Sequence, residues 1–203
     1  MEAKAPYRKL TLLVKYFRKM QLTDFDIFCP ITGKKGFGKS SKSISLARKF
    51  VQMYGKFCLK CKNEFFEPIK LCPKCNSETI KQLPFKLSKY LAYDNEDVKR
   101  LIHTLPPYAP LIADEAARFA MGEDWAKSEN KDMKKLMAQI RTKHLVMFFN
   151  IPKFKWMDSK YRDDMATIWI RVVKRGVALI FHPDLAEVDD SWHLKELQDC
   201  LRS

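Results

Sequence analysis

Eight residues constrain the fold of this chain more than any others, the stretch Gly33-Lys34-Lys35-Gly36-Phe37-Gly38-Lys39-Ser40. It matches the phosphate-binding loop pattern G-x-x-x-x-G-K-[ST] at every fixed position. Residues 25–29 before it, apolar except for Asp26, predict a buried strand, and the apolar spacing over 41–54 predicts a helix after it. In that context backbone N–H groups and the helix start at Ser41 favour a phosphate. We expect a nucleoside triphosphate here, with Lys39 on the β and γ oxygens and Ser40 on Mg²⁺. The alternative is a chance match in a loop rich in glycine and lysine.

Residues 108–115 predict a second buried strand, which ends in the acids Asp114 and Glu115. Asp114 would hold Mg²⁺ through its water shell, and Glu115 would polarise the attacking water, because metal and nucleophile must meet at the γ-phosphate. The alternative is an acidic pair that only caps a helix. A further strand over 145–149 ends at Asn150, which would position water or report on the γ-phosphate, or would simply begin a turn.

Spacing predicts the elements around these motifs. Residues 5–20 predict an amphipathic helix that covers a face or edge of the sheet and keeps its cations, Arg18 included, toward water; a helix that lies on a membrane or on nucleic acid is the alternative. Pro30 should lie beyond the end of the first strand, because a central strand needs its N–H groups. The other expectations are a strand at 87–93, a helix capped by Asp94 or Asn95 that runs to about Thr104, a helix at 132–142, and a hairpin of 165–173 with 177–181.

Four of the six cysteines form two C-x-x-C pairs, Cys58 with Cys61 and Cys72 with Cys75. Two such pairs can aim four thiolates at one point, which is the tetrahedral ligand set of a structural Zn²⁺ site. Disulfides and a redox dithiol are the alternatives. Residues 56–89 hold eight basic and three acidic residues with phenylalanines between them. This composition predicts either contact with nucleic acid or a solvated face around a small core.

Length and composition bound the organisation of the chain. With 203 residues we expect one P-loop domain, residues 1–56 and 81–203, with a zinc ribbon inserted at 57–80. The net charge of +14 favours a polyanionic partner such as nucleic acid; a thermophile-like charged surface is the alternative. The apolar runs are too short to cross a bilayer and the start of the chain lacks a secretory pattern, so we expect a cytoplasmic protein.

The order of these motifs resembles the HerA/FtsK superfamily of DNA-pumping ATPases, particularly its zonular-occludens-toxin-like and viral genome-packaging members. The resemblance rests on the loop, on Asp114-Glu115-Ala116, on Gln139-Ile140-Arg141 and on the strand before Ile151-Pro152, and covers about residues 25–181 without the ribbon. It implies a three-layer, RecA-like P-loop fold of the additional-strand, catalytic-glutamate type. It also implies ATP hydrolysis that moves double-stranded DNA during packaging or transfer, in host cytoplasm for a viral member.

The resemblance further implies a hexameric ring in which a neighbour's arginine reaches the γ-phosphate. Arg141 is the candidate, with Arg118 and Arg162 as fallbacks, although a cation at its own helix end is the alternative for Arg141. Asn150 departs from the family, where a glutamine is common at this place.

Two other functions compete with a DNA motor. Type II thymidine kinases also combine a P-loop, an Asp-Glu strand end and a four-ligand zinc site, but their zinc site follows the acidic pair, whereas here it precedes it. The third possibility is a nucleotide-gated zinc-ribbon protein that binds DNA and moves nothing.

Overall fold

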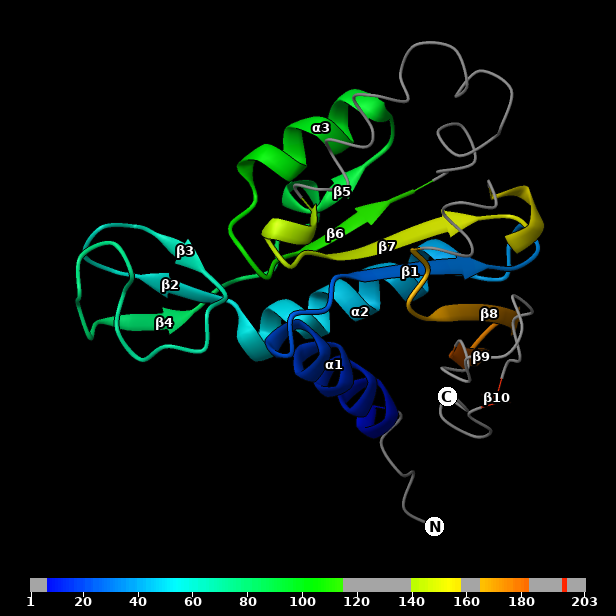
Figure 1. Cartoon of the computed structure of the whole chain (residues 1–203), viewed down its shortest axis with the longest axis horizontal. Coiled ribbons are helices and arrows are strands. Elements are labelled where there is room, and N and C mark those ends of the chain that lie inside the picture. The colour runs from blue at the N-terminus through cyan, green and yellow to red at the C-terminus, as the bar shows by residue number, and fades with distance from the viewer. Residues whose placement is uncertain (1–6, 115–139, 158–164, 183–194, 197–203) are drawn as a thin grey trace.

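The computed structural model describes residues 7–114, 140–157, 165–182 and 195–196, which form an α/β fold on one large sheet (Figure 1). The strands of this sheet are β1 (Ile27–Thr32), β5 (Leu91–Ala92), β6 (Pro110–Ala113), β7 (Val146–Ile151), β8 (Trp169–Lys174), β9 (Val177–His182) and β10 (Lys195–Glu196). Their order across the sheet is β10-β9-β8-β1-β7-β6-β5. From β8 to β5 the strands pair in parallel, and β9 and β10 pair antiparallel at one edge. The predicted α/β class is therefore confirmed.

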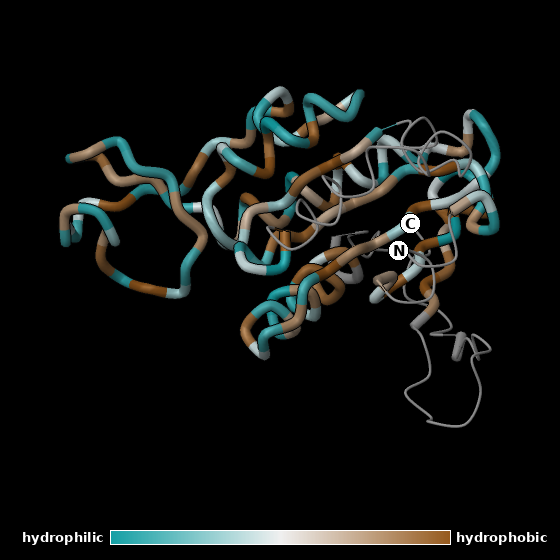
Figure 2. The backbone as a smooth tube through the Cα atoms, turned by 45° about the horizontal axis from the view of Figure 1, so that its top comes forward, coloured by the Kyte–Doolittle hydropathy of each residue, from teal (hydrophilic) through white to brown (hydrophobic). Residues whose placement is uncertain are grey.

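Two N-terminal helices contact each other beside the sheet. Helix α2 (Lys39–Tyr54) contacts β1, β6 and β7, and buries Leu46, Ala47, Phe50 and Val51. Helix α1 (Tyr7–Leu22) packs on α2 and β1 through the buried residues Leu13, Val14 and Phe17. Figure 2 shows hydrophobic segments along the central strands, where the core lies. The expected role of the first helix, which was to cover the sheet, is confirmed.

Arg18 on α1 does not point to water, so the prediction for this residue is wrong. Its side chain is buried, and the guanidinium lies over the rings of Tyr54 and Tyr108, 5.2 and 4.9 Å from their centroids. It donates hydrogen bonds to the Phe66 carbonyl oxygen at 2.6 Å and to Gln21 Oε1 at 3.3 Å. Burial lowers the pKa of Arg18. Arg18 thus joins α1 to residues from three distant parts of the chain.

The prediction that Pro30 ends the first strand is also wrong, because β1 continues through Pro30 to Thr32. Phe28 directs its backbone groups toward β8, where its N–H donates to Thr167 Oγ1 and its carbonyl accepts from the Thr167 N–H. Backbone groups alternate along a strand, so Pro30 faces the same side. There β8 pairs with β1 only from Ile31 onward, apart from an isolated bridge at Phe28. The missing N–H of Pro30 therefore falls in a gap of the ladder.

The strand predicted at 87–93 is mostly absent. Leu87–Lys89 form a 3₁₀ turn (η1), in which the Tyr90 N–H donates to the Leu87 carbonyl, and only Leu91–Ala92 pair with β6 as β5. Local turn bonds thus replace the ladder over the first part of the segment. Helix α3 (Asn95–Thr104) confirms the predicted span, and Asp94 caps it by accepting from the Asp97 N–H.

The predicted C-terminal hairpin is confirmed by β8 and β9, which pair antiparallel around a turn at Arg175 and Gly176. The other short elements are the 3₁₀ turn η2 (Phe154–Trp156) after β7 and a separate three-stranded sheet in the order β3-β2-β4. That sheet consists of β2 (Lys56–Cys58), β3 (Glu64–Phe65) and β4 (Ile80–Gln82), and we call residues 56–82 the cysteine module. It lies beyond the end of α2 in Figure 1.

A candidate nucleotide and metal site

The loop between β1 and α2 has a backbone that requires glycine at two positions. Gly38, directly before α2, has a φ of 93°, in the left-handed region that other residues rarely adopt. A Cβ atom on Gly33 would lie 2.5 Å from the Val172 carbonyl oxygen, so the close approach of β8 excludes a side chain. Lys39 and Ser40 then begin α2, where the first N–H groups have no acceptor inside the helix. Such a loop and helix start form a favourable anion site.

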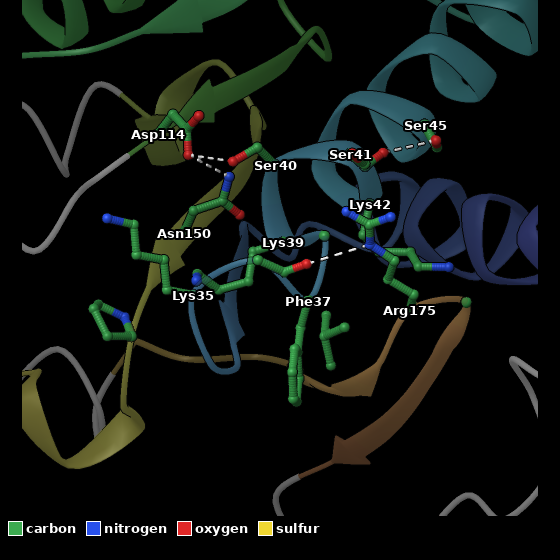
Figure 3. A pocket seen from close by; sticks show the side chains of 15 residues that line it. Lys35, Phe37, Lys39, Ser40, Ser41, Lys42, Ser45, Asp114, Asn150 and Arg175 are labelled. Atoms are coloured by element: carbon green, nitrogen blue, oxygen red, sulfur yellow. Dashed lines mark hydrogen bonds between the residues drawn. The ribbon is translucent and has the colours of Figure 1, made fainter.

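Polar side chains from three motifs meet beside this loop (Figure 3). The Ser40 hydroxyl donates to Asp114 Oδ1 at 2.9 Å. Asn150 Nδ2 donates to the same carboxylate oxygen at 2.9 Å and to the Ser43 hydroxyl at 2.9 Å. Asn150 is buried, and its Oδ1 atom has no hydrogen-bond partner in the described part of the chain. The structure therefore brings together Ser40, Asp114 and Asn150, as expected from the sequence.

Sheet topology explains why these residues meet. The loop follows β1, Asp114 follows β6, and Asn150 lies near the end of β7, which pairs with both of those strands. The carboxyl ends of parallel strands meet at one edge of a sheet, where ligands bind in such folds. Because β7 lies between β1 and β6, the side-chain amide of Asn150 lies between the loop and Asp114.

A cavity of about 1040 Å³, which we call the loop cavity, opens over the loop. Lys39 lines it and donates to the Gly33 carbonyl oxygen at 3.0 Å. Lys42 also lines it, and burial lowers the pKa of this lysine. The charged residues that line the described cavity are Lys35, Lys39, Lys42, Arg175 and Asp114. Four cations against one acid give the cavity a field that favours an anion with several charges.

Arg175 was not predicted as a site residue. It lies at the tip of the β8–β9 hairpin and lines the loop cavity, where its Nε donates to the Gly36 carbonyl oxygen at 3.5 Å. The only sequence signal was its place in the turn between two predicted strands, because nothing local relates it to Gly36, 139 residues away. The loop cavity thus includes an arginine of its own chain.

Several predicted residues lie outside the described ones. They are the catalytic candidate Glu115, the fallback arginines Arg118 and Arg162, and residues 132–139 of a predicted helix, whose residues 140–142 are helical.

Arg141 is described, and it lies far from the loop of its own chain. Its exposed side chain pairs with Asp26 at 3.4 Å, and Asp26 directly precedes β1, whereas the loop directly follows it. A strand of six residues is about 20 Å long, at roughly 3.3 Å per residue. Arg141 and the loop therefore lie at opposite ends of the parallel strands. Arg141 could reach only the loop of another copy.

The four cysteines of the two C-x-x-C pairs cluster at the end of the cysteine module. The Sγ atoms of Cys58, Cys61, Cys72 and Cys75 all lie within 4.8 Å of one another, and all four thiols are free. The distance is 3.6 Å from Cys58 to Cys75 and 3.4 Å from Cys61 to Cys72. Ligands at about 2.3 Å in a tetrahedral site are about 3.8 Å apart. The cluster could therefore hold a metal ion such as Zn²⁺.

The backbone gives the two pairs the same turn. Lys62 N–H donates to the Cys58 carbonyl and Asn76 N–H to the Cys72 carbonyl, and both donors have a left-handed backbone, with φ of 61° and 53°. A hydrogen bond from the Cys61 backbone lowers the pKa of Cys58, which favours a thiolate there, whereas burial raises the pKa of Cys61. Two matching turns thus present four sulfur ligands to one point.

No family model matches the chain, and comparison with curated proteins and with solved structures gives no match either. Within the described ranges, no helix is both long enough and apolar enough to cross a membrane.

Proposed function

We propose that the loop cavity binds a nucleoside triphosphate with Mg²⁺ and that the protein hydrolyses it to act on nucleic acid. One observation carries the proposal, the 2.9 Å contact between the Ser40 hydroxyl and Asp114 Oδ1 at the mouth of the loop. Neighbouring ligands of an octahedral Mg²⁺, at about 2.1 Å from the ion, are about 3 Å apart. The two oxygens thus have the spacing that they would need as neighbours around this metal, directly or through water.

The phosphate chain would be held by backbone N–H groups of the loop, by the start of α2 and by Lys39. Lys39 donates a hydrogen bond to the Gly33 carbonyl oxygen, which keeps its ammonium beside the loop. Exchanging that carbonyl for the β and γ oxygens is the expected response to a nucleotide. The four cations of the loop cavity support a ligand with the charge of a triphosphate.

Hydrolysis needs a group that orients and polarises water. Glu115 directly follows Asp114, and we assign it the role of general base. Within the described residues, Asn150 is the candidate to orient this water. Its Nδ2 atom is fixed by two hydrogen bonds, and its buried Oδ1 atom is left to accept one. The position of β7 between β1 and β6 supports a P-loop fold of the additional-strand type.

Nucleic acid is proposed as the partner on the basis of charge. The net charge of +14 exceeds what one nucleotide would neutralise, and the cysteine module adds a basic surface. With the family resemblance, this favours an oligomeric ATPase that translocates DNA during packaging or transfer. We propose zinc as the metal of the four cysteines, with a structural role, because all four ligands are sulfur.

The experiment measures ATP turnover by the purified protein under three conditions: without an addition, with double-stranded DNA, and with thymidine. Stimulation by DNA is expected for a motor, and phosphorylation of thymidine would instead indicate a nucleoside kinase. ATP binding with no effect of either would favour a nucleotide-gated binding protein. Lys39→Ala serves as the control for contaminating ATPases, and equal turnover in this variant would contradict the proposal.

A further inference from the structure

A second open cavity, of about 840 Å³, lies beside the loop, and we call it the basic groove. It runs between the loop, the β7–η2 connection and β8. It shares the lining residues Lys35, Phe37, Pro152 and Val172 with the loop cavity, so the two cavities are adjacent. The proposed function uses the loop cavity and leaves the basic groove without a role.

The charge of the basic groove is of one sign. Five cations line it and none of its described lining residues is acidic. All five are exposed, and no ion pair joins any of them to a carboxylate in the part of the chain that the structure describes. The five cations are Lys34, Lys35, Lys153, Lys155 and Arg171. Exposed like charges held together without counter-charges favour an anion that extends along the groove.

Two of the aromatic rings that line the groove stack on each other. Phe154 stacks on Trp169 with centroids 4.4 Å apart, and Trp169 stacks in turn on Phe181, which is buried and does not line the groove, at 4.5 Å. The Trp169 indole N–H donates to Thr32 Oγ1 at 2.7 Å, which fixes this ring against the end of β1. The groove thus combines a rigid apolar wall with cations around it.

We infer that the basic groove binds a single strand of nucleic acid, with phosphates on the cations and bases against the aromatic wall. Grooves that combine these two features bind unpaired strands, because unpaired bases offer their faces and duplex bases do not. The inference rests on the proposed function only for its nucleic-acid partner. Because Lys35 and Phe37 line both cavities, nucleotide and strand should change each other's affinity by the same factor.

The test is fluorescence anisotropy of a labelled oligothymidylate of about 20 nucleotides, a length that exceeds a typical single-strand site. No nucleotide is added, so failure of ATP binding or hydrolysis does not affect the result. The test variant is Lys155→Gln/Arg171→Gln, which leaves the loop intact. The control is Lys15→Gln/Lys19→Gln on α1, which removes the same charge from two exposed residues.

The affinity of the Lys155→Gln/Arg171→Gln variant should fall at least about tenfold at low salt, and its salt slope by about 1.4, since each single-strand phosphate contact contributes roughly 0.7. The Lys15→Gln/Lys19→Gln control should change by less than about twofold.

Three results would overturn the inference. The first is an equal loss in both variants, which would reduce the effect to net charge. The second is a fall in duplex affinity in the Lys155→Gln/Arg171→Gln variant as large as its fall in single-strand affinity, which would show that the groove does not require unpaired bases. The third is displacement of the labelled strand by polyglutamate or inorganic polyphosphate as effectively as by unlabelled strand at equal charge, which would show that bases contribute nothing.

Discussion

Replacing Arg18 with alanine should destabilise the whole fold, although Arg18 lies in none of the proposed sites. The guanidinium touches two tyrosine rings, each contact worth about 0.5–1 kcal/mol. Its loss also leaves the Phe66 carbonyl oxygen without its charged donor, at a cost of about 1–3 kcal/mol. The expected loss is therefore about 3 kcal/mol. For a chain of this length, roughly 2–4 °C per kcal/mol gives a Tm lower by about 6–12 °C.

Thermal unfolding followed by circular dichroism measures this effect. The matched control is Lys19→Ala, on the same helix but exposed, which should change stability by less than about 0.5 kcal/mol. Arg18→Lys should recover only part of the loss, because an ammonium keeps the charge but not the planar group between two rings. Equal melting temperatures for Arg18→Ala and Lys19→Ala would show that the buried contacts of Arg18 contribute nothing net.

Four further predictions concern the proposed nucleotide and zinc sites. Lys39→Ala should abolish nucleotide binding in titration calorimetry, whereas Glu115→Gln should bind nucleotide and lose hydrolysis; wild-type affinity in the lysine variant would refute the loop assignment. Protein purified with reductant should contain about one equivalent of zinc, and Cys72→Ser should lose it; elemental analysis that finds no metal would contradict the zinc site. Arg141→Ala should slow turnover by about 10³-fold or more with little change in ATP affinity. Mixing the Arg141→Ala protein with the Glu115→Gln protein should restore some activity, because some interfaces of a mixed oligomer join an intact Glu115 to an intact Arg141. No recovery in confirmed mixed oligomers would exclude Arg141 as a residue acting across subunits. Asn150→Ala should lower kcat about 10²-fold with little change in KM, and a rise in KM alone would assign it to binding.

The features predicted best are those that depend on residues a few positions apart. The loop needs glycine at fixed spacing, and each cysteine pair needs only its own turn, so short patterns contain the information. The span of α3 follows for the same reason, because Asp94 caps the helix four residues before Val98 enters the core. Local chemistry decides these elements, and neighbours in space change little.

The wrong predictions concern features decided by distant residues. Helical spacing assigned Arg18 to the solvent side of α1, but Tyr54 and Tyr108 close over it from other elements. Pro30 was excluded from the strand by a rule that holds where the strand on the side that residue 30 faces needs an N–H donor at this position. Whether β8 needs it depends on the register of β8 on β1, which no pattern within β1 contains.

Arg175 shows how topology adds to a site what motifs miss. The hairpin was predicted, but not that β8 pairs with β1, the strand that leads into the loop. Once that pairing is known, the turn after β8 must lie beside the loop, because parallel neighbours end at the same edge of the sheet. The same reasoning places Arg141, just before β7, at the opposite ends of these strands. One cation of the site thus comes from its own chain by topology, and Arg141 could serve only the site of a neighbouring copy.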